Sequence, residues 1–348
     1  MQEENIKEIL ELYDINRNIA NINYLCEGYD DKDDLRIRVI AKVELCDKSS
    51  YIIKFVLEEE HPYKLIEEQS RFSEGLRCLG INTAKRIKCG DKYCCLYSLG
   101  DSRLSVTVEE YLGEEIKEIN ENIVSEISSL MARMHMLSEN NNYHLVNDTI
   151  WNLWNDNSDI MRGYMKFKEL RDKIIELDEN NIEIYENILR VYKSRKDKIS
   201  KLRPSLPQYA TQGDYSVNNL TYNNEEIGIF DYNIAGDEIL VNDMIIEGLF
   251  VTKVMDLSEG LKDSDREELF KLFVKAYINI RKLTSDELNV INDLYAIVVP
   301  FWWERIIYNK NKSLVSIINN KDITKLNEFL IETYMMLTTN YFDINNLL

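Results

Sequence analysis

The first third of the chain alternates between helix-like and strand-like patterns of apolar residues. Residues 1–17 place Ile6, Ile9, Leu10 and Tyr13 on one stripe, which predicts an amphipathic helix. Apolar and β-branched residues then alternate, which predicts strands. The remaining elements expected in this part are strands over 36–45 and 51–56, a helix over 63–79, and strands over 92–98 and 104–111.

Helical periodicity dominates from about residue 120 onward. One β-rich island, residues 208–232, interrupts it. The sequence therefore predicts an α+β protein with two lobes. A small lobe with an antiparallel sheet and a helix covers residues 1–112, and a larger, mainly helical lobe covers residues 113–348. The join falls near Tyr111-Leu112-Gly113.

Composition narrows the possible partners. The 348 residues include 61 acidic and 42 basic side chains, so the formal charge is −19. Neutralising phosphates requires clustered Lys and Arg, and this balance weighs against a nucleic-acid partner and an anionic membrane surface. The 45% hydrophobic content excludes wholesale disorder. Only 12 glycines and 4 prolines are present, which indicates few tight turns and much helix.

The expected location is the cytoplasm. The acidic N-terminal residues Met1 to Asn5 are unlike a secretory signal, and no apolar run approaches the roughly 20 residues that span a bilayer. The six cysteines form no Cys-x-x-Cys pair, so we expect reduced thiols rather than a zinc site. The oligomeric state is left open.

The β-rich island carries the most informative polar residues. Its two short apolar strands are joined by the Asn-rich turn 223–226, which predicts a hairpin. The hairpin brings Asn219, before its first strand, beside Asp231, after its second. An amide oxygen beside a carboxylate suits Mg²⁺, which prefers oxygen ligands. Asp214 precedes Asn219 by five residues, the spacing found in kinase catalytic loops.

These residues resemble a known family, the aminoglycoside phosphotransferase and choline kinase superfamily of small-molecule kinases. Its catalytic loop has the form His-Gly-Asp-x-x-x-x-Asn, followed by a hairpin and Ile-Asp-Phe or Ile-Asp-Trp. Residues 212–219 and 229–232 match this form with two departures. Gln212 occupies the His position, and Tyr232 follows the metal-binding Asp. The resemblance implies a protein-kinase-like fold with two lobes.

The resemblance also implies a role for each matching residue. Asp214 corresponds to the catalytic base or hydroxyl-positioning residue, and Asn219 and Asp231 to the Mg²⁺ ligands. ATP, or alternatively GTP, is the expected phosphate donor. Gln212 stands where the family's His braces the loop; because glutamine can donate and accept hydrogen bonds, we expect reduced support rather than loss of function.

A kinase also needs a lysine on a strand of the small lobe, paired with a helix glutamate. Lys54 interrupts an apolar strand, where a lone charge is costly unless it is paired. The following helix offers Glu67 and Glu68. Glu68 falls on the apolar stripe that includes Leu65 and Phe72, so it is the predicted partner of Lys54, with Glu67 as the alternative.

Residues 108–114, which include the end of the last predicted strand of the small lobe, resemble the family's hinge. There the backbone of the linker holds the nucleotide base, which assigns Glu110, Tyr111 and Leu112 to nucleotide binding. The phosphate-covering loop is weak, because only Gly28 lies near the first strands and no P-loop motif is present.

Other polar residues admit two interpretations. His135 lies in a Met-rich apolar helix, where a packed core residue is expected more often than a catalytic one. Asp243 either anchors the catalytic loop, as a downstream Asp does in the family, or is structural. Trp151, Trp154, Trp302 and Trp303 with Glu304 either form a wall for a cationic acceptor or belong to the core.

Two functions follow as hypotheses. The first is an ATP- or GTP-dependent, Mg²⁺-dependent kinase that phosphorylates a hydroxyl of a small molecule, with a cationic or amino-bearing acceptor such as an aminoglycoside or a choline-like alcohol favoured by the acidic composition. The second is a pseudokinase-like binding or regulatory protein, for example a spore-coat-associated one. Gln212 and the scarcity of glycine near the first strands motivate this alternative.

Overall fold

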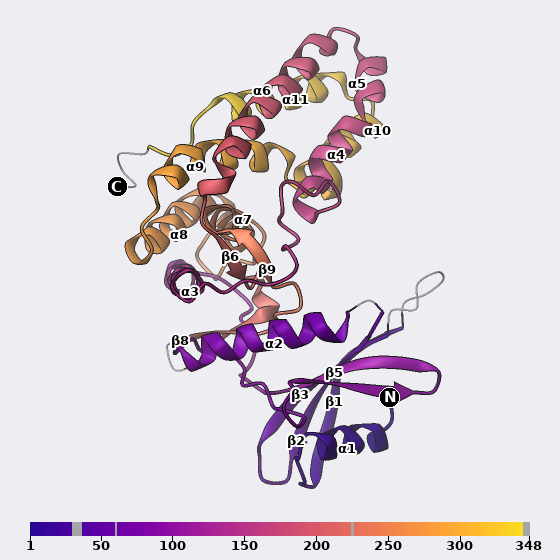
Figure 1. The fold of residues 1–348 in the computed structure, drawn as a ribbon. Helices are drawn as coiled ribbons and strands as arrows, with labels where there is room; N and C mark the ends of the chain where they lie inside the picture. Colours follow the sequence, from indigo (N-terminus) through magenta and orange to yellow (C-terminus); the bar gives the residue numbers. More distant parts are fainter. Residues whose placement is uncertain (30–36, 60, 224–225, 344–348) are drawn as a thin grey trace.

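The computed structural model describes the chain except residues 30–36, 60, 224–225 and 344–348. It shows two lobes, with helix α2 lying between the sheet of the small lobe and the helices of the large lobe (Figure 1). The predicted α+β class and the two-lobed, protein-kinase-like arrangement are confirmed. The boundary at residue 112 stays a prediction.

The small lobe is built on a five-stranded antiparallel sheet of order β1-β2-β3-β5-β4. Its apolar core lies between this sheet and helix α1, whose stripe of Ile6, Ile9 and Leu10 is buried as predicted. Its elements are α1 (Glu3–Leu12), β1 (Ile19–Tyr29), β2 (Ile37–Leu45), β3 (Ser50–Leu57), α2 (Tyr63–Cys78), β4 (Cys94–Leu99) and β5 (Ser102–Glu110).

Most predicted elements of the small lobe are found within a few residues of their expected bounds. Arg36, the first residue of the predicted strand 36–45, lies outside the described residues. Strand β1 escaped the sequence pattern. It lies at the edge of the sheet, pairs only with β2, and none of its described side chains is fully buried, so it lacks the long apolar run of a central strand.

In the large lobe, helices pack around a central helix and two small two-stranded sheets. One sheet pairs β6 with β9, and the other pairs β7 with β8. Its strands are β6 (Gln208–Thr211), β7 (Leu220–Asn223), β8 (Glu226–Ile229) and β9 (Gly236–Ile239). Its α-helices are α3 (Glu121–Asn140), α4 (Arg162–Glu169), α5 (Arg171–Leu177), α6 (Asn181–Leu202), α7 (Leu240–Lys253), α8 (Arg266–Ile280), α9 (Ser285–Val298), α10 (Leu314–Asn319) and α11 (Ile323–Thr338).

Helix α7 is the central helix and is buried on nearly every side. Its apolar residues explain this burial, but it also carries the buried carboxyl groups of Asp243 and Glu247. A buried carboxyl group needs partners, so α7 fixes the position of whatever these groups contact.

The crossing from the small to the large lobe is tied to the hairpin β7–β8. The N–H of Ile116 donates to the carbonyl of Leu220 at 2.9 Å, and Glu115 forms an isolated β-bridge with Thr221. The segment after β5 therefore lies beside the hairpin that carries the candidate site. No helix of the described ranges is long and apolar enough to cross a membrane.

Candidate active site

The hairpin β7–β8 places Asn219 and Asp231 side by side, as the sequence predicts. Leu220 pairs with Ile229, and the N–H of Phe230 donates to the carbonyl of Asn219 at 3.0 Å. Asn219 is therefore the last residue before the paired strands, opposite Phe230, and Asp231 is the second residue after them. Within the predicted turn 223–226, residues 224–225 lie outside the described part of the chain.

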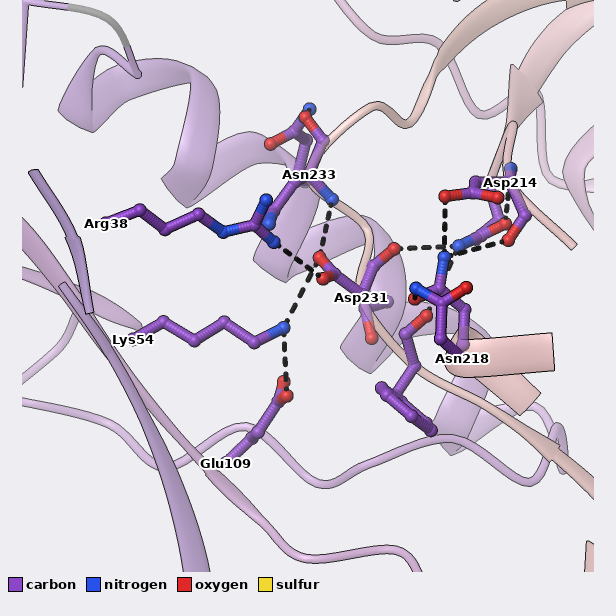
Figure 2. A network of polar contacts seen from close by, with 12 residues as sticks. Arg38, Lys54, Glu109, Asp214, Asn218, Asp231 and Asn233 are labelled. Atoms are coloured by element: carbon purple, nitrogen blue, oxygen red, sulfur yellow. Dashed lines mark hydrogen bonds and ion pairs between the residues drawn. The ribbon is translucent and has the colours of Figure 1, made fainter. Parts of the chain in front are cut away.

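The loop before the hairpin holds the carboxylate of Asp214 in place (Figure 2). Asn219 Nδ2 donates to Asp214 Oδ2 at 2.7 Å and to the Asp214 carbonyl at 3.1 Å. The N–H of Ser216 donates to Asp214 Oδ1 at 3.2 Å. Burial raises the pKa of Asp214, although these hydrogen bonds to its ionised form oppose the rise. The carboxylate is thus fixed in direction and more basic than a solvated one.

Gln212 joins the catalytic loop to the segment that carries Asp231. Its side chain is fully buried. Its Nε2 donates to the carbonyls of Phe230 and Asp231 at 3.2 and 2.7 Å, and its Oε1 accepts from the N–H of Asp214 at 2.7 Å. A glutamine therefore braces this loop through both ends of its amide, one as donor and the other as acceptor.

Asp231 lies among positive charges (Figure 2). Its Oδ1 is 3.3 Å from Lys54 Nζ, and its Oδ2 is 3.4 Å from a guanidinium nitrogen of Arg38 on β2. Burial alone raises the pKa of Asp231, but the charges of Lys54, Arg38 and Arg86 outweigh it, so the pKa lies below its usual value. Asp231 also has a positive φ of 58°, a backbone conformation that is uncommon outside glycine.

The predicted pairing of Lys54 with Glu68 is wrong. Lys54 Nζ lies 3.2 Å from Glu109 Oε1, on the neighbouring strand β5, in addition to its contact with Asp231. Glu68 is exposed on α2. The alternative, Glu67, is buried but accepts from the N–H groups of Tyr93 and Cys94 at 2.8 and 3.1 Å.

The physical reason is the direction of the buried stripe on α2. The predicted stripe relied on Leu65, which is only half-buried, and on Leu79, which is 43% exposed and lies beyond the end of the helix. The buried face is shifted around the helix axis and includes Ile66, Gln69, Ser70, Phe72, Ser73 and Leu76. Glu68 lies off this face, so it points to solvent.

Three residues of this site escaped the sequence analysis. Glu109, which is 2% exposed, also pairs with buried Arg86 at 3.0 Å, so Arg86, Glu109, Lys54 and Asp231 form a chain of alternating charges. Gln69 Nε2 donates to the carbonyls of Asn233 and Ala235 at 2.9 and 3.1 Å and ties α2 to the segment after Asp231. Glu109 carried a signal related to that of Lys54, because each is a charge directly beside apolar residues of its strand.

The predicted hinge residues line a cavity of about 270 Å³ between the lobes. Glu110, Tyr111 and Leu112 contribute to its wall together with Ile52 and Phe230. Two hinge N–H groups are already paired, Glu110 with the Lys85 carbonyl and Tyr111 with the Ser50 carbonyl, both at 2.9 Å. The hinge backbone is therefore fixed to the small lobe, and the hinge residues line the cavity.

A second cavity, of about 340 Å³, lies directly beside Asp214. The rings of Trp151 and Trp303 lie nearly parallel, with 5.9 Å between their centroids, and both line it. Asp159 and Arg162 add an ion pair of 3.0 Å to its wall. Two of the four tryptophans that were candidates for an acceptor wall thus lie at this cavity. Trp154 is directed elsewhere and donates to Ser200 Oγ at 3.0 Å.

Glu247 on α7 anchors the catalytic loop from below. Its Oε2 accepts from the N–H of Tyr215 at 3.0 Å, and its Oε1 accepts from Trp151 Nε1 at 2.7 Å. Trp151 Nε1 also lies 2.7 Å from the carbonyl of Gly213. Glu247 therefore contacts the loop backbone directly. Its signal in the sequence was one carboxylate within the apolar run 244–251.

Asp243 and His135 form a separate buried pair. His135 Nε2 lies 3.0 Å from Asp243 Oδ2, and its Nδ1 lies 2.7 Å from the Tyr277 hydroxyl. Burial lowers the pKa of His135 to about 3 and raises the pKa of Asp243 to about 8. His135 is a packed core residue, in line with the interpretation favoured by its apolar helix.

The donor atoms near Asp231 fit a magnesium ion. Asp231 stays ionised because its pKa is lowered, and Asn219, whose carbonyl accepts from the neighbouring Phe230, carries an amide oxygen. Mg²⁺ is usually held in kinases by one or two such protein oxygens, while water and phosphate oxygens complete its coordination. The described residues contain no group of three or more His, Cys, Asp or Glu that suits a metal ion, so a metal held by protein side chains alone does not fit.

Comparison with known proteins places the fold. No protein-family model matches the sequence, and no curated protein matches it. Solved structures do match over nearly the whole chain. The amicoumacin kinase hAmiN, in complex with AMP-PNP, Ca²⁺ and Ami, is 17% identical with a TM-score of 0.62 and covers 100% of this chain and 98% of its own.

Two other solved structures agree. A microcompartment-associated aminopropanol kinase is 13% identical with a TM-score of 0.60, covering 99% of this chain and 100% of its own. An aminoglycoside phosphotransferase from Alicyclobacillus acidocaldarius is 9% identical with a TM-score of 0.51, covering 93% of each chain. The chain has the fold of these small-molecule kinases, which confirms the fold that the resemblance implied.

Proposed function

We propose that this chain, which has the fold of the small-molecule kinases, transfers a phosphoryl group from a nucleoside triphosphate to a hydroxyl of a small molecule. The observation that carries the proposal is the joint geometry of Asp214, Asn219 and Asp231. Asn219 links the other two: its side chain holds Asp214, and its carbonyl accepts from Phe230, directly before Asp231. That arrangement suits in-line transfer, in which positioning and charge neutralisation supply most of the catalysis.

Each proposed role follows from a contact. Asp214, on the wall of the 340 Å³ cavity, orients the acceptor hydroxyl and accepts its proton. Lys54 binds donor phosphates, held by Glu109 on one side. Asn219 and Asp231 hold Mg²⁺, which neutralises charge on the phosphates when bound. The 270 Å³ cavity beside Glu110, Tyr111 and Leu112 receives the base of ATP or GTP.

The acceptor class follows from the wall of the Asp214 cavity. Trp151 and Trp303 offer aromatic surface to it, and Asp214 offers a carboxylate, whereas Asp159 is paired with Arg162. An ammonium group gains from both contacts, so we propose an amino-bearing alcohol as acceptor. Two structural neighbours, an amicoumacin kinase and an aminopropanol kinase, support this class.

The test is nucleotide turnover in the presence of a panel of acceptors. We expect ADP or GDP formation that depends on Mg²⁺ and on an amino alcohol, an aminoglycoside or choline in the assay. Asp214→Ala should keep binding Mg²⁺–nucleotide in calorimetry but lose transfer by about a thousandfold, because a positioned base contributes about 10²–10⁴-fold. Undiminished transfer by Asp214→Ala with the true acceptor contradicts the proposal.

The binding-only alternative has lost one of its two motivations. Gln212 makes three hydrogen bonds that keep the loop and the Asp231 segment together, so its presence does not indicate a degraded site. Calorimetry with Mg²⁺ and ATP or GTP separates the two functions. If neither nucleotide binds at millimolar concentration, the pseudokinase-like function is favoured.

A further inference from the structure

A large cavity of about 810 Å³ lies in the helical lobe, outside the candidate active site. It opens between the C-terminal end of α7, the π-helix Glu304–Tyr308, and helices α10 and α11. Its volume lies in the range of pockets that hold small organic ligands. Its apolar wall consists of Leu249, Val299, Trp302, Ile317 and Phe329.

This cavity is separate from the one beside Asp214. No residue lines both. The wall between them is a pair of stacked rings, Trp302 on the side of the large cavity and Trp303 on the side of Asp214, with 4.2 Å between their centroids and 25° between their planes. An occupant of the large cavity therefore contacts neither Asp214 nor the hairpin residues.

Two N–H groups at this cavity lack acceptors. Arg305 uses Nη1 for Glu332 at 3.0 Å and Nη2 for Thr333 at 3.1 Å, but its Nε has no acceptor among the residues that the structure describes. The same holds for Nε1 of Trp302, whose residue is 9% exposed. A buried N–H without an acceptor costs about 1–3 kcal/mol.

The charge of the cavity wall differs from that of the whole chain. The cations are Lys253, Arg305, Lys312 and Lys325, and the anions are Glu304, Glu328 and Glu332, so 4 − 3 gives +1 in a chain of −19. Lys312 makes no ion pair with any described residue, and burial lowers the pKa of Arg305, whose guanidinium stacks 4.3 Å from the Phe329 ring centroid. The π-helix that carries Arg305 is itself a rare geometry that frequently occurs at functional sites.

We propose that this cavity binds an organic monoanion with an apolar body, such as an aromatic carboxylate. Its carboxylate would meet Arg305 and Lys312, and its body would pack against Trp302 and Phe329. Small movements of the two side chains would bring the unpaired N–H groups to the anion. This proposal stands independently of the kinase function, because it uses none of the residues of that site.

The test uses calorimetry on the full chain with naphthoate and its neutral isostere naphthamide as probes. We expect the carboxylate to bind at least about tenfold more tightly than the amide, because a charge-assisted hydrogen bond contributes about 1.5–3 kcal/mol and 1.4 kcal/mol is tenfold. Arg305→Met keeps apolar volume but removes one of the two charges that meet the carboxylate, and it should reduce the difference between the two affinities. Equal affinities in the unaltered protein overturn the proposal without any variant.

Arg162→Met is the matched control, because it removes the arginine of the Asp214 cavity in the same way. It should leave naphthoate binding unchanged. If Arg162→Met weakens binding and Arg305→Met does not, the probe occupies the wrong cavity and the proposal fails. Should Arg305→Met not fold, Lys312→Gln and Trp302→Phe replace it. Both should weaken naphthoate binding, and unchanged affinity in both overturns the proposal.

Discussion

Gln212 braces the loop that carries Asp214 with a side-chain amide, at the position where the family that the sequence resembles has an imidazole. Its amide has a donor end and an acceptor end, and both are used: two carbonyls of the Asp231 segment accept from Nε2, and Oε1 accepts from the N–H of Asp214. Asp214 and Asp231, the proposed base and a proposed metal ligand, are thereby joined by one fully buried side chain. The geometry of the site depends on this side chain even though it contacts neither substrate.

Replacing Gln212 should separate bracing from mere burial. Gln212→Leu keeps the volume but leaves the Asp214 N–H and two carbonyls without their partner, so we expect a loss of about 1–3 kcal/mol of stability and about a tenfold or greater fall in kcat. Gln212→His should restore most of the activity. The measurements are thermal unfolding and steady-state turnover. A Leu variant as active as the original protein, or a His variant no better than Leu, contradicts the bracing role.

Glu109, rather than a helix glutamate, should control the position of Lys54. Glu109→Gln removes one of the two carboxylates that contact Lys54, so we expect a KM for nucleotide raised about tenfold and a lower kcat. Glu68→Gln is the matched control, because Glu68 is exposed and outside this contact. Kinetics with varied nucleotide measure both variants. If Glu68→Gln has the larger effect, Glu109 does not control the position of Lys54 during catalysis.

At the scale of elements, the sequence predicted whatever depends on local periodicity. Strand β2 alternates clearly and β3 is a run of apolar residues around Lys54. The hairpin β7–β8 has apolar strands around an Asn-rich turn, so the meeting of its two ends, which carry Asn219 and Asp231, was correctly predicted. The partner of Lys54 depended on the rotation of α2 about its axis. That rotation is set by packing against the β9 side of the large lobe through Gln69, a contact 164 and 166 residues away in sequence.

The loop anchor escaped prediction for a related reason. Asp243 and Glu247 are one helical turn apart on α7, and both are buried, so the sequence alone offers no basis for choosing between them. The choice depends on which carboxylate the folded loop meets. Asp243 meets His135 from α3, whereas Glu247 meets the loop backbone and Trp151.

Helix α7 should therefore transmit a change at Glu247 to catalysis. Glu247→Gln keeps one acceptor oxygen for two N–H donors, those of Tyr215 and Trp151. The new NH2 group is itself a buried donor that faces one of these N–H groups instead of an acceptor, and we expect a loss of about 1–3 kcal/mol of stability with a lower kcat. Glu268→Gln on α8, whose side chain is 76% exposed, is the control and should change neither. Unfolding midpoints and kcat that match those of the control contradict the anchoring role.

At the scale of the whole molecule, the charge of −19 is divided between surface and core. Most acidic residues are exposed, but Glu238, Asp243 and Glu247 are fully or almost fully buried in the large lobe. Burial raises the pKa of Glu238 to about 7, that of Asp243 to about 8 and that of Glu247 well above its usual range. The folded protein thus holds protons near neutral pH that the unfolded chain, with ordinary carboxyl groups, has released.

These buried groups should make the protein less stable as pH rises from about 6.5 to 8. Stability falls with pH wherever the folded state binds more protons, by about 1.4 kcal/mol per pH unit for each proton. His135 does not oppose this, because above about 6.5 it is neutral in both states. Asp243→Asn should reduce the slope of stability against pH, whereas Asp172→Asn at the surface should not. Chemical unfolding at several pH values measures both variants.

Surface repulsion also grows with pH, but salt screens it. A slope that disappears in high salt would therefore assign the effect to the surface charge and contradict the role of the buried carboxyl groups.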